Sequence, residues 1–218
     1  MQLNQLGAGM TTSEDMLQAW LAHEREVVER VQAGAGWGVA RPEQVVGRSG
    51  LDLLQAMLRG ELPAPPITRT LDFQLLEVGE GRAVFQGTPG AGHLNPMGTV
   101  HGGWYATLLD SALGCAVHTM MPPGRGYTTA ELGVNLVKSI PLKVQRVRAE
   151  GKVLHCGRQL ATAEARLVGP DGTLRWPVRR PHAKNSSAVG PLRGPTANSN
   201  SFANQRRTRG SIRADALS

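Results

Sequence analysis

The chain has 218 residues, a formal net charge of +7, 40% hydrophobic residues and two cysteines, and no apolar run approaches the ~20 residues that span a membrane. This length suits one domain with a sizeable core plus extensions, and two cysteines exclude a disulfide framework. The first residues lack the basic-then-apolar pattern of a signal peptide, so we expect a cytoplasmic protein whose cysteines are reduced.

Two helices are predicted before a proline-rich segment. Ser13 stands where it would cap a helix that continues to about residue 31, with Glu14 and Asp15 in its first turn. The apolar stripe of this helix consists of Met16, Trp20, Val27 and Val31. A second helix is expected over residues 51–58, before a stiff linker at Pro63, Pro65 and Pro66. We expect both helices to pack over the main domain, and a substrate lid is the alternative.

From Ile67 onward the hydrophobic period indicates strands. The expected strands are residues 67–78, 82–86, 128–138, 143–154 and 158–168. The first two form a hairpin around Gly79-Glu80-Gly81. Together with one long apolar helix, these strands predict an α+β fold, in which an antiparallel sheet wraps around the central helix.

The central helix is expected to begin near Gly102 and to end before Pro122. Asp110 is the one acid in this apolar segment, and a lone carboxylate on a buried helix is costly to desolvate. The residues that project within about 40° of Asp110 are Gly103, Ala106, Gly114 and Val117. Three of the four are small, so we expect an open channel to the carboxylate. An acid with a purely structural partner is the alternative.

The backbone at the helix start is a second candidate for chemistry. The N–H groups of Gly102 and Gly103 have no partner within the helix and can stabilise a developing oxyanion, although an ordinary helix start has the same donors. Gly102 and Asp110 are eight residues apart, or about 12 Å along the axis. Both can act on one carbonyl only if two copies of the helix meet antiparallel, which predicts a two-fold homodimer with shared sites.

The helix start also carries a motif with a definite spacing to the acid. The motif is Asn95-Pro96-Met97-Gly98-Thr99-Val100-His101-Gly102-Gly103, and Leu108-Leu109-Asp110 follows it. It resembles the hotdog-fold acyl-CoA thioesterases of the PaaI-like class, and residues 50–57, 60–63 and 128–135 extend the resemblance over about residues 47–174. The resemblance implies a hotdog fold, a homodimer or homotetramer, and hydrolysis of an acyl-CoA to a free acid and coenzyme A without a further cofactor.

Roles for single residues follow from the motif. Asp110 is expected to act as general base on water or as nucleophile, and the Gly102 N–H to bind the oxyanion. The resemblance implies that Asn95 and His101 orient or polarise the thioester, and that Thr129 positions the attacking water.

Candidates for contacts with coenzyme A are Gly103, Lys138 and Arg158. No metal is predicted, because His101 and His118 project to other sides of the helix than Asp110.

The end of the chain differs from the rest in composition. We divide the chain into an N-terminal helical extension (1–62), a hotdog thioesterase domain (63–174) and a disordered basic tail (175–218). The tail has nine Lys or Arg and one acid, whereas the preceding residues have 15 basic and 16 acidic residues. The class usually continues with a last strand, but Pro177 and Pro181 argue against one here, so the sheet is expected to be one strand short.

Two alternatives to an enzyme stay open. One is a non-catalytic hotdog protein that binds acyl-CoA, and the other is an inactive product with an aberrant C-terminus. Nucleic acid is not an expected partner, because the basic run Arg206-Arg207-Thr208-Arg209 has no interleaved aromatic residues on which bases could stack.

Overall fold

The computed structural model describes residues 12–135, 144–171 and 182–191, with the backbone alone for residues 182–185. Its helices are α1 (Ser13–Ala33), α2 (Pro42–Val45), α3 (Gly50–Leu58), α4 (Ile67–Thr70) and α5 (Gly102–His118), with a 3-10 turn at Ala91–His93. Its strands are β1 (Phe73–Gly79), β2 (Arg82–Gly87), β3 (Arg125–Asn135), β4 (Val147–Cys156), β5 (Leu160–Val168) and β6 (His182–Pro191). None of the described helices is long and apolar enough to cross a membrane.

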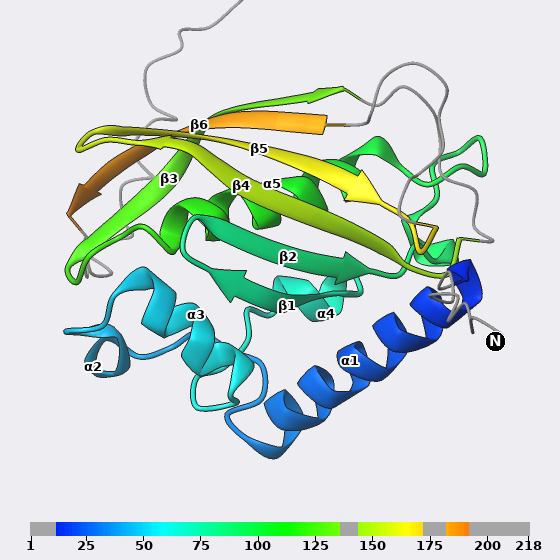
Figure 1. Ribbon diagram of the computed structural model, residues 1–218, viewed down its shortest axis with the longest axis horizontal. Coiled ribbons are helices and arrows are strands. Elements are labelled where there is room, and N and C mark those ends of the chain that lie inside the picture. The colour runs from blue at the N-terminus through cyan, green and yellow to red at the C-terminus, as the bar shows by residue number, and fades with distance from the viewer. Residues whose placement is uncertain (1–11, 136–143, 172–181, 192–218) are drawn as a thin grey trace, which may run out of the picture.

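The six strands form one antiparallel sheet in the order β1-β2-β4-β5-β6-β3, and this sheet curves over α5 (Figure 1). The buried face of α5 includes Leu109, Leu113 and Val117, which are fully buried in the main core. Close approach of helix and sheet depends on Gly151 of β4, where a Cβ atom would lie 2.2 Å from the Ala112 carbonyl oxygen. The predicted α+β arrangement around a central helix is therefore confirmed.

Helix α1 packs against the sheet, as predicted for the N-terminal helices. Its residues Val27 and Val31 pack with Leu76 of β1 in a second core cluster. Beside this cluster, Glu24 of α1 pairs with Arg146 at 2.6 Å, and the Arg148 guanidinium lies 4.3 Å from the centroid of the Trp20 ring.

The cap of α1 differs from the prediction by one residue. Thr12, not Ser13, is the N-cap: its hydroxyl accepts from the Asp15 N–H at 3.1 Å, and the Asp15 carboxylate accepts from the Thr12 N–H. The Thr-x-x-Asp spacing makes this reciprocal pair possible, which a cap at Ser13 does not.

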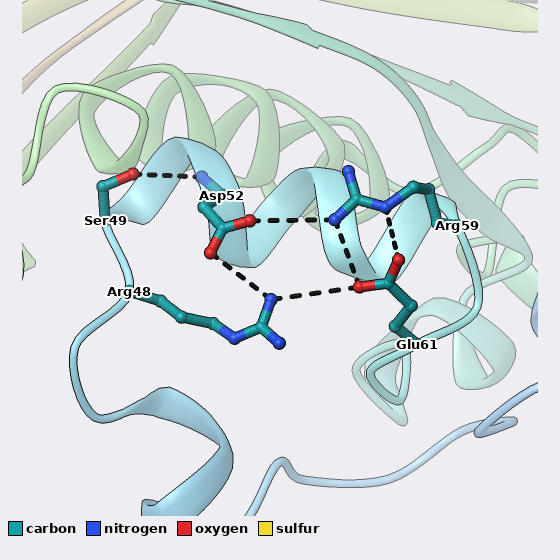
Figure 2. Close-up of polar contacts among 5 residues, drawn as sticks. All are labelled: Arg48, Ser49, Asp52, Arg59 and Glu61. Carbon is teal, nitrogen blue, oxygen red and sulfur yellow. Dashed lines mark hydrogen bonds and ion pairs between the residues drawn. The ribbon is translucent and has the colours of Figure 1, made fainter.

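A network of ion pairs ties α3 to the turn that follows it (Figure 2). The Asp52 N–H donates to the Ser49 hydroxyl at the helix cap, and the Asp52 carboxylate pairs with Arg48 at 3.3 Å and Arg59 at 3.7 Å. Glu61 completes the network with Arg59 at 2.6 Å and Arg48 at 3.9 Å. These side chains are partly exposed, so the network defines the local geometry more than it stabilises the fold.

Helix α3 begins against the end of α5. The Gly50 N–H donates to the Met121 carbonyl at 2.8 Å, and a Cβ atom on Gly50 would lie 1.8 Å from the His118 carbonyl oxygen. Only glycine fits this contact, which therefore fixes the N-terminal extension to the central helix.

The segment after the prolines is a short helix and not the start of a strand. In α4 the Thr68 N–H donates to the Pro65 carbonyl and the Arg69 N–H to the Pro66 carbonyl, both at 3.1 Å. Prolines favour such a first helical turn, because their fixed φ suits it and they have no N–H to satisfy. The predicted strand over residues 67–78 therefore shortens to β1.

The tail prediction is wrong for residues 182–191. These residues form β6, which lies between β5 and β3 and pairs with both, so the sheet is not one strand short. Pro177 and Pro181 precede the strand and do not interrupt it. The other tail residues, 175–181 and 192–218, lie outside the described part of the chain.

Candidate active site

Asp110 lies half-buried in the middle of α5, where its carboxylate meets a hydroxyl from the sheet. The Thr129 Oγ1 of β3 donates a hydrogen bond to Asp110 Oδ1 at 3.1 Å. The structure thus brings together the acid of the motif and the threonine that the family resemblance selected. Because Thr129 donates its single hydroxyl hydrogen to Oδ1, Asp110 Oδ2 is the oxygen left for a water or a substrate atom.

A β-bulge in β3 gives Thr129 this orientation. The pairing of β3 with β6 shifts between Thr129 and Glu131, so Ala130 is an extra, exposed residue. Before the bulge Thr129 faces α5, and after it Leu132 and Val134 pack against the core. Since side chains alternate along a strand, one extra residue is needed for all three to face the same side.

At the start of α5, one of the two predicted backbone donors already has an acceptor. The His101 side chain caps the helix, and its Nδ1 accepts from the Gly103 N–H at 2.9 Å. Within the described residues, no acceptor is found for the Gly102 N–H. Of the two predicted backbone donors, Gly102 is therefore the available one. A neutral imidazole that accepts at Nδ1 has its proton on Nε2, which makes the exposed His101 a second donor.

Asn95 holds the loop that leads into the helix. Its Oδ1 accepts from the Met97 N–H at 3.0 Å and the Thr99 N–H at 3.1 Å, and its Nδ2 donates to Thr99 Oγ1 at 2.8 Å. At the tip of this turn Gly98 has φ +75, a conformation that favours glycine. One amide hydrogen of Asn95 is left for a ligand, but the observed bonds of this side chain all shape the loop.

The expected open channel past small residues is wrong on the β3 side of the helix. Tyr127 fills the space over Gly114, where a Cβ atom would lie 2.4 Å from the tyrosine Oη. Val117 is fully buried in the core. Gly103 is exposed and Ala106 half-buried, so the approach to Asp110 is open on the side of the helix start. Burial raises the pKa of the Tyr127 phenol, which stays neutral beside the acid.

Two partly buried polar groups farther along α5 take no part in the proposed chemistry. The His118 ring lies 5.6 Å from the Tyr127 ring, and burial lowers the pKa of its imidazole. Burial also raises the pKa of the Cys115 thiol to about 12, so this cysteine is not a nucleophile. Among the described residues, no three His, Cys, Asp or Glu side chains are grouped to hold a metal ion.

Of the predicted coenzyme A contacts, the two in the described part of the chain, Gly103 and Arg158, do not lie together at Asp110 within one chain. Arg158 lies in the turn between β4 and β5, and its carbonyl accepts from the Arg125 side chain at the start of β3. Thr129 is four residues farther along β3, about 13 Å away. Lys138 lies outside the described residues, and Gly103 lies at the opposite end of α5 from Arg125.

Sequence reasoning missed Tyr127, a neighbour of the acid, and Ser187, a neighbour of Thr129. Tyr127 had a signal, since it precedes Thr129 by two residues in an alternating strand and must share its face. Ser187 of β6, which pairs with Thr129, had none, because the composition of the tail did not predict a strand.

Comparison with known proteins identifies the superfamily that part of the chain matches and supports the fold. Residues 97–175 match the family model of the thioesterase superfamily, while no protein of curated function matches the sequence. Among solved structures, AziG of S. sahachiroi is 17% identical with a TM-score of 0.53 over 58% of this chain and 98% of that one. A thioesterase from Haemophilus influenzae is 14% identical with a TM-score of 0.50 over 58% and 83%.

A further match is a mutant of the phenylacetic acid degradation protein PaaI from Thermus thermophilus, at 25% identity and a TM-score of 0.48 over 56% of this chain and 97% of that one. At identities this low, AziG and the Haemophilus thioesterase support the fold alone. The segment that carries the helix start and Asp110 thus matches the thioesterase superfamily, and the chain has the hotdog fold that its motif predicted.

Proposed function

We propose that the protein is a thioesterase that hydrolyses an acyl-CoA to a free acid and coenzyme A without a further cofactor. The match to the thioesterase superfamily supports thioester hydrolysis, and coenzyme A as the thiol is the finer part of the proposal. The observation that carries the proposal is the pair of Asp110 and Thr129, joined at 3.1 Å on a helix whose start has an available backbone donor.

In the proposed reaction, Asp110 takes a proton from water through Oδ2 while the water oxygen attacks the thioester carbon. The carbon–sulfur bond then breaks, and the proton passes to the leaving thiolate. Thr129 Oγ1 can accept a hydrogen bond from the same water through its lone pairs, which would orient it. Direct attack by the Asp110 carboxylate, followed by hydrolysis of the anhydride, is the alternative step.

The developing oxyanion needs donors that Asp110 does not supply. The Gly102 N–H and the His101 Nε2–H lie together at the start of α5, where the helix dipole also favours negative charge. Loss of one such donor typically lowers kcat by about 10² to 10³. Asn95 contributes by holding the loop that leads to His101.

A second copy of the chain is needed to bring acid and donors together. Gly102 and Asp110 lie on one continuous helix, about 12 Å apart. Strand β3 is the last strand of the described sheet, so its outer edge is available to the same edge of a partner. A two-fold homodimer through β3 would place the two α5 helices antiparallel, with Gly102 of one near Asp110 of the other. Assembly of such dimers into a tetramer stays a prediction.

The alternatives make different predictions for the purified protein. A non-catalytic acyl-CoA-binding protein would bind the ligand without turnover. An inactive, aberrant product is disfavoured because β6 completes the sheet.

The decisive experiment is an assay against a panel of acyl- and aryl-CoA thioesters. Asp110→Asn should lower kcat by ~10²-fold or more while acyl-CoA binding persists. Asp72→Asn is a matched control, because Asp72 has φ +49, which asparagine also tolerates. Turnover by Asp110→Asn at the wild-type rate would exclude Asp110 as base or nucleophile, and binding without turnover by the wild type would favour the binding protein.

Mixed dimers test the shared site. Gly102→Pro removes the donor N–H at the first helical position, where proline is well tolerated. Mixed with Asp110→Asn, it should form dimers with one intact site, and up to about half of the activity per mixed dimer should return. No recovery after demonstrated subunit exchange would exclude the shared geometry.

A further inference from the structure

Ser187 of β6 is a buried hydroxyl beside the candidate active site. Its residue is 0% exposed, and it pairs with Thr129 of β3 on one side and Ala161 of β5 on the other. Among the residues that the structure describes, Ser187 Oγ has no hydrogen-bond partner. Unpaired buried hydroxyls are rare and destabilising, so this one calls for a partner.

The direction of the Ser187 side chain follows from its neighbours. Ala161 belongs to the core under the sheet, and Val189, two residues farther along β6, packs against the same core. Ser187 therefore faces α5, as Thr129 does. Residues directly opposite on one face of an antiparallel pair have Cβ atoms about 4.5–5.5 Å apart, so one water can bridge the two hydroxyls, which make no direct bond.

The donors and acceptors of the three side chains complement one another. Thr129 Oγ1 uses its hydrogen on Asp110 Oδ1, so its lone pairs are what it offers to a neighbour. A serine hydroxyl can donate to them through one water. The result is a chain of hydroxyl bonds that ends on the carboxylate, in which each bond polarises the next.

We infer that Ser187 is a positioning residue for Asp110, in that its hydroxyl donates to a bridging water that donates to Thr129 Oγ1, and so fixes the bond from Thr129 to the acid. The effect of Ser187 on catalysis rests on the proposed function. The hydrogen bonds that link Ser187 to Asp110 do not depend on it. It also gives β6 a role in the site as well as in the sheet.

Removal of the Ser187 hydroxyl should weaken the bond that favours the ionised carboxylate. In Ser187→Ala we therefore expect the titration of the Asp110 carboxyl to move to higher pH than in the wild type. Because one net hydrogen bond is lost, kcat should also fall roughly threefold to tenfold, with little change in KM. Among the described residues, the titratable groups that interact with Asp110 are Tyr127 of β3 and Cys115 of α5. Burial raises the pKa of both, so neither ionises at the pH at which a carboxyl group titrates.

The test is an NMR titration of the Asp110 carboxyl carbon in the full chain, with the signal assigned by its loss in Asp110→Asn. Ser186→Ala is the matched control, because Ser186 is the neighbouring residue on β6 and faces the other side of the sheet. Ser187→Thr, which retains the hydroxyl, should restore the wild-type pKa if it folds.

A rise of the Asp110 pKa in Ser187→Ala but not in Ser186→Ala supports the inference, whether or not any thioester is hydrolysed. An unchanged Asp110 pKa, together with a higher melting temperature from removal of an unpaired hydroxyl, would overturn it. Absence of thioesterase activity in the wild type would instead count against the proposed function alone.

Discussion

Removal of β6 provides the sharpest test of the structure. Two truncations differ only in this region: one ends after Asp171 and lacks β6, and the other ends after Pro191 and keeps it. The composition of the tail predicts that both behave alike. The structure predicts that the shorter one loses its fold, because β3 is paired with β6 alone in the described sheet and would be left without a neighbour.

The size of the effect follows from the two ladders. β6 pairs with ten residues of β3 and with seven of β5. At about 0.5–1.5 kcal/mol net per backbone hydrogen bond, even ten bonds amount to roughly 10 kcal/mol. Small domains have a total stability of about 5–15 kcal/mol, so loss of both ladders removes most or all of it. It also uncovers the part of α5 under Ser187 and Val189.

Thermal unfolding followed by circular dichroism, with size-exclusion chromatography, measures the outcome. The chain ending at Pro191 should unfold cooperatively, whereas the chain ending at Asp171 should aggregate or lack a cooperative transition. If the shorter chain unfolds cooperatively within a few degrees of the longer one, β6 is not part of the stable sheet and the reasoning is refuted.

Three further predictions concern single residues. Gly114→Ala should destabilise the fold by about 1–3 kcal/mol in urea denaturation, since the new Cβ would lie 2.4 Å from the Tyr127 hydroxyl oxygen. Tyr127→Phe in the same chain should recover part of the lost stability. Unchanged stability in Gly114→Ala would show that the Tyr127 ring moves aside freely. Burial lowers the pKa of His118, so below about pH 6.5 the unfolded state binds a proton that the folded state does not, and stability should fall as the pH falls. Melting curves of His118→Gln should show a weaker pH dependence, and an equal pH dependence would contradict the assignment. Thr12→Ala should remove about 1 kcal/mol of helix stability and so speed amide hydrogen exchange in the first turn of α1, while Ser13→Ala should not. Equal exchange rates in the two variants would contradict the cap at Thr12.

Local patterns in the sequence determined much of the fold and part of the site. The helical spacing after Gly102 predicted α5, and the alternation around Gly79-Glu80-Gly81 predicted the first hairpin. Helix geometry depends only on neighbouring residues, so the separation of Gly102 and Asp110 along α5 also followed from the sequence. The resemblance to PaaI-like thioesterases selected Thr129, which the structure places within hydrogen-bond distance of Asp110.

Only the tertiary structure decided what depends on residues far apart in the chain. Strand β6 has few large apolar residues, and it forms because its backbone is paired on both sides, which composition does not reveal. The same holds for Tyr127, whose ring fills the space over Gly114 and closes an expected channel, and for the bulge that turns Thr129 toward α5. Periodicity reports which face of an element is buried, but the identity of the neighbour on that face is set by packing across the whole domain.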